Sequence, residues 1–158
     1  MPFEIHDQAL SIVGPRSAWH ECASDDVKGY LNRRCSTATG ELFVPTGQNV
    51  RRPDVVGLSV SRQDLVRERT TMLSPGVIEV VVEIISHYSN KAKDRISVAR
   101  DREQKFREYA AVGIPEYWIV DEALDDPLDA SVEIYRLRGG GYVPIRVVLL
   151  SQLLTEKP

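Results

Sequence analysis

The pattern of apolar and polar positions predicts a strand–helix–strand unit in the second half of the chain. The stretch VIEVVVEII (77–85) is the most apolar of the sequence and predicts a central strand that is buried on both faces. Residues 91–112 carry apolar side chains at helical spacing and are followed by Gly113 and Pro115, a strong stop signal for a helix. EYWIVD (116–121) predicts the next strand, which a right-handed crossover should place parallel to 77–85.

Shorter patterns predict the remaining elements. Alternating apolar positions indicate a hairpin over FEIHDQALSIV (3–13), and three-to-four spacing indicates an amphipathic helix from about 17 to 35. Strands are expected at 41–45 and 54–60, and a last hairpin joins SVEIYRLR (131–138) to YVPIRVVLL (142–150) across three glycines. This mixed order favours a single α/β domain over 1–158, with helices packed on a mixed β-sheet.

Composition narrows the class of protein. The 158 residues are 42% apolar and 27% charged, which excludes a disordered chain and a collagen-like repeat. The apolar runs fall far short of the roughly 20 residues that span a bilayer, so no membrane is expected as a partner. Two cysteines make neither a disulfide framework nor a four-ligand zinc site, and the first residues do not resemble a signal peptide. A cytoplasmic location is therefore expected.

Charge is unevenly distributed although the net charge is only −3. Residues 91–107 hold seven basic side chains against three acids, and residues 116–133 hold seven acids and no base. The basic segment is suited to a phosphate backbone, but it would equally suit a solvated helix face that the acidic segment neutralises.

Three carboxylates stand in apolar surroundings. Asp54 opens an apolar strand directly after Arg51-Arg52-Pro53, Glu83 interrupts the run VVVEIIS, and Glu4 lies between Phe3 and Ile5. Burying a carboxylate is costly unless it is paired or binds a metal. Two such acids on neighbouring strands could hold Mg²⁺ through hard oxygen ligands, and the metal would polarise a phosphodiester.

A lysine one helix later completes this candidate site. Lys105 follows Asp101 and precedes Tyr109 by one helical turn each, so the three should share one helix face. An ammonium group there could neutralise developing charge or orient the attacking water. Simpler interpretations remain open: Lys105 could be solvated and Glu83 could lie on an exposed edge.

Other structural alternatives concern the remaining acids and His20. Asp54 could pair with Arg51 or Arg52, and His20 could be structural. Glu79 competes with Glu83, because alternation along a strand should point both to the same side.

Four segments of the chain resemble the Uma-two family, a group of restriction-endonuclease-like proteins in the PD-(D/E)XK nuclease superfamily. They are RPDVV, VVVEIIS, DREQKFREYAAVGIPEYWIVD and IYRLRGGGYV, and the opening FEIHDQALSIVGPRSAWH is also similar. The resemblance therefore covers most of the chain, from Phe3 to about Val143, and is most specific between Asp101 and Asp121. The family pattern is matched there by Asp101, Lys105, Tyr109, Gly113-Ile114, Glu116-Tyr117-Trp118 and Val120-Asp121.

The resemblance implies a restriction-endonuclease-like core and a role for each candidate. Asp54 matches the aspartate of the PD element and Glu83 the acid of the second half-motif, and both would be ligands of Mg²⁺ or Mn²⁺. The superfamily lysine would stand at position 85, which is Ile85 here. The resemblance implies that in this family the lysine lies on the following helix, where Lys105 matches it. Glu4 matches an early glutamate that would support the metal or the base, and His20 a histidine that opens the first helix.

The function implied is a metal-dependent endonuclease that hydrolyses phosphodiester bonds of nucleic acid, with DNA the expected substrate. A homodimer would suit cleavage of both strands of a duplex. Two alternatives stay open: a catalytically degenerate relative that binds nucleic acid or a protein, and an interaction domain with structural ion pairs. The segment between Ser86 and Asp101 is longer than the family leads us to expect, so Asp94 competes with Asp101 as the family aspartate. The candidates for contact with nucleic acid are Arg51, Arg52, Arg95, Arg100, Arg102 and His20.

Overall fold

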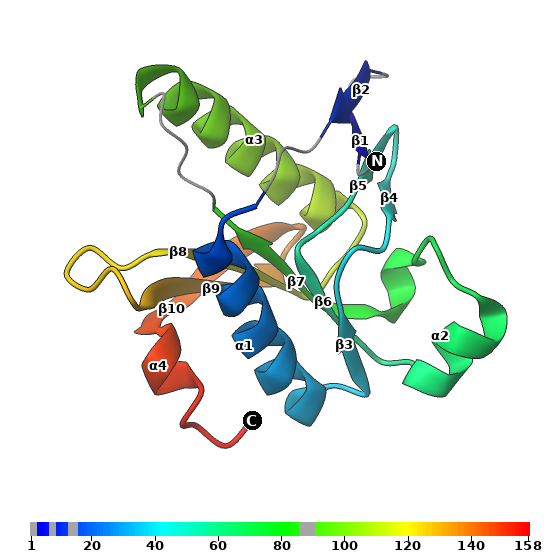
Figure 1. The fold of residues 1–158 in the computed structure, drawn as a ribbon. Coiled ribbons are helices and arrows are strands. Elements are labelled where there is room, and N and C mark those ends of the chain that lie inside the picture. Colours follow the sequence, from blue (N-terminus) through cyan, green and yellow to red (C-terminus); the bar gives the residue numbers. More distant parts are fainter. Residues whose placement is uncertain (1–2, 7–8, 13–15, 86–90) are drawn as a thin grey trace.

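A six-stranded mixed sheet forms the centre of the molecule (Figure 1). The computed structural model describes residues 3–6, 9–12, 16–85 and 91–158, and within these it gives the backbone alone for Phe3, His6, residues 9–12, residues 91–98 and Arg100. The parallel pairing of β7 with β8 lies inside the sheet, and the other neighbouring strands of this sheet pair antiparallel. The strands are, in spatial order, β10 (Gly141–Leu149), β9 (Ala130–Arg138), β8 (Glu116–Glu122), β7 (Ile78–Ile84), β6 (Val55–Leu58) and β3 (Thr37–Thr39).

Helices cover both faces of this sheet (Figure 1). Helix α1 (Ala18–Arg34) and the short α4 (Leu150–Leu153) pack on one face, and α3 (Lys91–Ala111) packs on the other. Helix α2 (Arg62–Glu68) and the 3-10 turn η1 (Pro75–Val77) lie between β6 and β7 in the chain. A smaller antiparallel sheet stands beside α3, in the order β2 (Ala9–Ile12), β1 (Phe3–His6), β5 (Asn49–Arg51) and β4 (Val44–Thr46).

Local sequence signals fix the ends of the two long helices. The Ser17 hydroxyl caps α1 by accepting a hydrogen bond from the backbone N–H of His20 at 3.2 Å. Helix α3 ends where Gly113 adopts a φ of 80°, a left-handed conformation that glycine tolerates without a steric penalty. Because the chain turns there, β8 starts directly beside β7 and runs parallel to it.

Strand β7 separates two hydrophobic clusters, as its apolar sequence predicts. Val80, Val82 and Ile84 belong to the cluster beneath α1, whereas Val81 belongs to the cluster beneath α3. This alternation places Glu83 on the α3 face of a central strand. The predicted central position of 77–85 and its parallel pairing with 116–121 are thus confirmed.

The predicted fold class and both hairpins are also confirmed, but several elements differ. The turn at Asp7-Gln8 lies outside the described residues. Strand β4 begins at Val44 and contains Pro45 instead of ending there, and β6 ends at Leu58. The sequence patterns missed β3 and β5, whose three residues are too few to show alternation, and α2, which has no buried residue and hence no apolar stripe.

A β-bulge overturns the expectation that Glu79 and Glu83 point to one side. Gly57 pairs with Val80 and Leu58 pairs with Ile78, so Glu79 is an extra residue that shifts the alternation. Glu79 is exposed and interacts with Cys35, where burial and the Glu79 carboxylate raise the pKa of the thiol to about 12. Glu79 is therefore no competitor for the position of Glu83.

A buried ion pair ties the smaller sheet to α3. The Arg51 guanidinium on β5 is only 1% exposed and donates twice to Glu108 of α3, from Nε at 2.7 Å and from Nη2 at 3.0 Å. Asn49 Nδ2 donates to the same carboxylate at 2.5 Å, and the Thr46 hydroxyl donates to it at 3.1 Å. The three side chains come from β4 and β5, so Glu108 fixes where these strands meet the helix.

The substitution Glu108→Gln tests this attachment. It removes the charge that compensates a buried guanidinium, leaving Arg51 with Asp101 at 3.5 Å and Glu4 at 3.7 Å. We expect a loss of about 3 kcal/mol in the free energy of unfolding, measured by urea denaturation. Glu103→Gln, which removes an exposed carboxylate from the same helix, is the control and should cost less than about 1 kcal/mol. Equal losses in the two variants would contradict the structural role of Glu108.

Candidate active site

Asp54 is buried at the start of β6 and accepts contacts from three directions. Its Oδ2 accepts a hydrogen bond from the backbone N–H of Ile84 at 2.7 Å. Its Oδ1 lies 3.1 Å from Arg16 Nη2 and 3.1 Å from His20 Nε2. Burial alone would raise the pKa of Asp54, but His20, the Ile84 N–H and Arg16 together outweigh it and hold that pKa below its usual value. Asp54 is therefore ionised at neutral pH.

Glu83 stands one residue before Ile84 on β7 and faces α3. Its Oε1 accepts a hydrogen bond from the Tyr109 hydroxyl at 2.7 Å, and its Oε2 lies 3.1 Å from Lys105 Nζ. Burial, opposed by Lys105 but reinforced by the charges of Asp54 and Glu4, raises the pKa of Glu83 to about 7. Burial and the neighbouring acids thus raise the pKa of Glu83, whereas the pKa of Asp54 is lowered by its own partners.

Lys105 is the cation at the centre of the acidic residues. Its Nζ lies 3.2 Å from Asp101 Oδ2 and 3.9 Å from Glu4 Oε1, in addition to its contact with Glu83. Burial opposes its charge, but these carboxylates outweigh burial and raise the pKa of Lys105. The predicted common helix face of Asp101, Lys105 and Tyr109 is confirmed, because the last two both bind Glu83.

Glu4 joins the site through the pairing of β1 with β5. Its Oε1 accepts a hydrogen bond from the backbone N–H of Arg52 at 3.1 Å, and its Oε2 lies 3.7 Å from Arg51 Nη1. The structure therefore brings together the four residues predicted to be catalytic, Asp54, Glu83, Lys105 and Glu4.

Comparison with known proteins decides the family. The family model described as "Uma2: Putative restriction endonuclease" matches residues 2–158. The chain belongs to the Uma2 family. A solved structure titled a putative nuclease of DUF820, from Anabaena variabilis, superposes with a TM-score of 0.61 at 15% sequence identity. The match covers 93% of this chain and 75% of the other, and at this identity it shows a shared fold. No curated protein matches.

Two predicted nucleic-acid contacts of this Uma2 protein are buried. Arg51 is 1% exposed and His20 is 2% exposed, so both side chains lie beneath the surface in this structure. The sequence pattern reports charge but not depth, and it gave no sign that these two side chains are buried. Arg51 binds Glu108, and His20 supports Asp54.

The other predicted contacts lie nearer the surface or outside the description. Arg102 is more than a third exposed and pairs with Glu133 of β9, and the half-buried Arg52 pairs with Glu41. The side chains of Arg95 and Arg100 lie outside the described residues, as does that of Asp94. Among the described side chains, Asp101 lies against Lys105, with Oδ2 at 3.2 Å from Nζ.

Sequence patterns missed Arg16. It stands directly before the cap of α1 and four residues before His20, and this spacing could have suggested that the two side chains reach the same group. The apolar context of Asp54 drew attention to the acid but gave no sign of its partner.

The oxygen donors and the local charge fit a divalent cation on Asp54 and Glu83. Five carboxylates surround three permanent cations, so the acids outnumber these cations by two. The carboxylates are those of Glu4, Asp54, Glu83, Asp101 and Glu108, and the cations are Arg16, Arg51 and Lys105. In the part of the chain that the structure describes, no three or more Asp, Glu, His or Cys side chains are arranged to hold a metal. A site of two carboxylates is typical of Mg²⁺, which keeps several waters.

Two other features lie outside this site. A cavity of about 310 Å³ opens between α1, α4 and residues 126–130, and none of the acids around Lys105 lines it. Among the helices of the described residues, none is long and apolar enough to cross a membrane.

The raised pKa of Glu83 predicts a pH dependence of stability. Between pH 4.5 and about 7 the folded protein holds a proton on Glu83 that the unfolded chain has lost, so stability should fall as pH rises through this window. The shift corresponds to about 3 kcal/mol. The lowered pKa values of Asp54, Glu108 and Glu116 act below this window, and the raised pKa of Lys105 acts above it.

Glu83→Gln should flatten this dependence, as measured by urea denaturation from pH 4.5 to 8. Glu103→Gln, the exposed control, should keep the slope of the wild type. Parallel slopes in wild type and Glu83→Gln would show that Glu83 titrates normally.

Proposed function

We propose that this Uma2 protein is a divalent-metal-dependent endonuclease that hydrolyses phosphodiester bonds of nucleic acid, with DNA as its substrate. Asp54 and Glu83 are the proposed ligands of Mg²⁺ or Mn²⁺, Lys105 is the proposed catalytic cation, and Glu4 supports it. Membership of a family described as restriction endonucleases supports the class of reaction.

The contact of Lys105 with Glu83 is the observation that carries the proposal. In the PD-(D/E)XK pattern the lysine would stand at Ile85, on the same strand as the acid. Here Lys105 Nζ reaches Glu83 from α3 at 3.1 Å, while Asp54 is fixed to the backbone N–H of the intervening Ile84. An acid, a second acid and a lysine thus converge although the lysine lies on another element.

Each side chain of the site has a distinct task in this mechanism. Tyr109 donates to one oxygen of Glu83 and Lys105 to the other, so the orientation of this carboxylate is fixed before any ligand arrives. A bound divalent cation would polarise the phosphate and lower the pKa of a water. The Lys105 ammonium offers positive charge where the phosphorane-like transition state gains negative charge, and it can orient the attacking water.

Nucleic acid suits the charge around the site. Helix α3 carries the basic segment 91–107, and Arg102 extends from it more than a third exposed. Cleavage of both strands of a duplex would use two copies of the site, and we propose a homodimer on DNA. The alternative is a degenerate relative that binds nucleic acid without cleaving it. The contacts that each oxygen of Asp54 and Glu83 already makes within the protein would suit this alternative.

Incubation with supercoiled plasmid, single-stranded DNA and RNA tests the activity. We expect cleavage with millimolar Mg²⁺ or Mn²⁺, none with chelator, and a loss of at least about a hundredfold in Asp54→Ala and Lys105→Ala. Asp125→Asn, which changes an exposed acid remote in sequence from the site, should cleave like the wild type. Binding of DNA without cleavage under all conditions would support the degenerate alternative.

Metal binding should be visible without activity, as thermal stabilisation. Free Mn²⁺ at about a hundred times its dissociation constant stabilises the folded protein by about 2.7 kcal/mol. For a chain of this length that is a rise in Tm of about 5–10 °C. We expect this rise in wild type and in Asp125→Asn, and its absence in Asp54→Asn. An equal rise in Asp54→Asn would place the metal elsewhere.

The contacts of Asp54 predict that Asp54→Asn loses stability in chelator as well. A carboxylate whose pKa is lowered stabilises the folded protein, so its neutralisation costs stability even if the site binds metal. Loss of stability in chelator therefore does not decide between a metal site and a structural ion pair, and the metal-dependent shift does.

Reversal of Arg102 tests the nucleic-acid face. Arg102→Glu should weaken DNA binding and reduce the log–log salt slope by about 0.9, the value for one phosphate contact. Arg62→Glu, on the exposed start of α2, should change neither quantity. Fluorescence anisotropy over a range of salt concentrations measures both, and an unchanged slope in Arg102→Glu would assign this side chain to its ion pair with Glu133 alone.

A further inference from the structure

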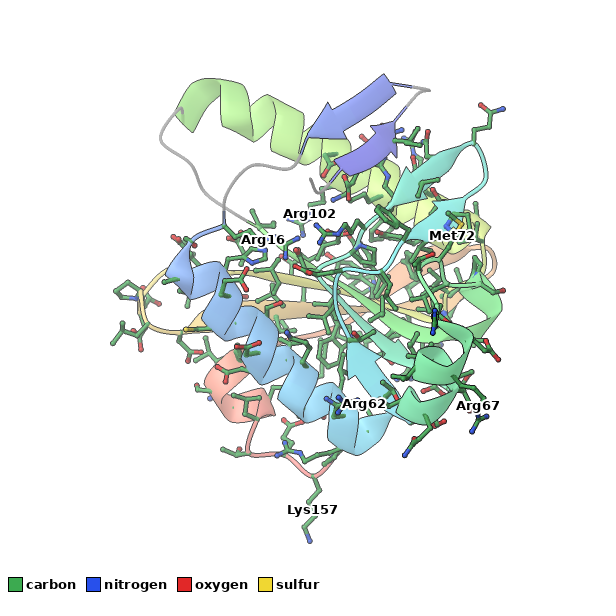
Figure 2. All side chains as sticks on the ribbon, turned by 45° about the vertical axis from the view of Figure 1, so that its right-hand side comes forward. Arg16, Arg62, Arg67, Met72, Arg102 and Lys157 are labelled. Atoms are coloured by element: carbon green, nitrogen blue, oxygen red, sulfur yellow. The ribbon has the colours of Figure 1, made fainter. Side chains whose placement is uncertain are left out.

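The Arg16 guanidinium lies beside Asp54 Oδ1, where a metal ion bound to this oxygen would need room. Arg16 precedes the cap of α1, and its guanidinium lies 3.1 Å from Asp54 Oδ1. Figure 2 shows Arg16 at the start of α1 and Arg102 toward α3, whereas Arg62 and Arg67 lie toward α2. Arg16 therefore belongs to the region of the candidate site, although the proposed mechanism gives it no task.

The attachment of Arg16 differs from that of the other arginine in the site. Arg51 is 1% exposed and donates twice to Glu108. The Arg16 side chain is 18% exposed, and in the part of the chain that the structure describes it forms an ion pair with one oxygen of Asp54. A partly exposed guanidinium can turn toward solvent without being stranded in the interior.

Asp54 does not depend on Arg16 for its orientation. His20 Nε2 contacts the same Oδ1 at 3.1 Å, and the Ile84 N–H holds Oδ2 at 2.7 Å. His20 is 2% exposed and positioned by the first turn of α1, so it stays in place if Arg16 turns away. The carboxylate would then present the side of Oδ1 that Arg16 had occupied.

A divalent cation and the guanidinium would compete for that oxygen. Both are positive, so a cation bound to Asp54 repels Arg16 from its present position. A guanidinium matches the geometry of phosphate oxygens, with which it forms two parallel hydrogen bonds. A phosphodiester brought to the cation would place such oxygens next to the displaced side chain.

We propose that Arg16 is a phosphate-binding residue whose guanidinium is held by Asp54 until a divalent cation displaces it. This inference rests on the proposed metal-dependent function and assigns the substrate's phosphate a partner on this chain. Arg16 thus neutralises Asp54 in the metal-free protein and binds substrate in the metal-loaded one.

The first measurement is Mn²⁺ affinity, by calorimetry and by thermal stabilisation of the full chain. Arg16→Gln removes the competitor, so its Mn²⁺ affinity should rise about three- to tenfold over the wild type. Arg16→Lys keeps a competing charge and should bind Mn²⁺ nearly as the wild type does. Arg102→Gln, which removes a nearby cation paired with Glu133 instead, and Arg62→Gln, a remote one, should leave the affinity within about twofold.

The second measurement is binding of a labelled DNA oligonucleotide, verified as intact by gel after each titration. With Mn²⁺, Arg16→Gln should bind about tenfold more weakly than the wild type, the effect of one charge-assisted contact. In chelator the two proteins should bind alike, because the wild-type guanidinium is then held by Asp54.

The outcomes separate this inference from the proposed function. The displacement of Arg16 would be contradicted if wild type and Arg16→Gln bound Mn²⁺ equally well. It would also be contradicted if the substitution weakened DNA binding equally with and without Mn²⁺. Neither result would contradict the metal site. Absence of Mn²⁺ binding in both proteins would overturn the metal site and this inference together.

Discussion

Buried negative charge is the constraint around which this molecule is built. Asp54 directly precedes β6 and Glu83 lies on β7, and both are buried in the six-stranded sheet, where an uncompensated carboxylate would destabilise the fold. Compensation comes from outside the sheet: α1 delivers His20 next to Arg16, and α3 delivers Lys105 and Tyr109. The positions of both long helices are therefore tied to the same two acids, from opposite faces.

Sequence patterns predicted those parts of this arrangement that depend on residues close together in the chain. The strands 77–85 and 116–121 are long, apolar and bounded by clear stop signals, and the structure contains both. The common face of Lys105 and Tyr109 follows from helical spacing alone, so their meeting at Glu83 was within reach of the sequence. The acids were recognised because charge inside an apolar strand is rare.

The parts that were missed arise from contacts between distant segments. Glu108 resembles any other acid on a charged helix, and only the arrival of β4 and β5 makes it the partner of a buried arginine. The burial of Arg51 and His20 was missed for the same reason, because their depth is set by packing and not by their neighbours in the chain. The bulge at Glu79 likewise depends on the pairing of β6 with β7.

The location of Lys105 on a helix has a structural consequence. Ile85 follows β7 directly and stands where a strand lysine would stand, so the cation beside Glu83 must come from α3. Glu108 in turn attaches α3 to Arg51 of the smaller sheet. Within the helix, Glu108 accepts hydrogen bonds from the Gln104 side chain and from the backbone N–H of Val112. Glu4, which contacts Lys105 and Arg51, comes from the same sheet. The smaller sheet thus helps to position Lys105 against Glu83. The geometry of the site therefore depends on the interface between this sheet and α3, which contains neither Asp54 nor Glu83.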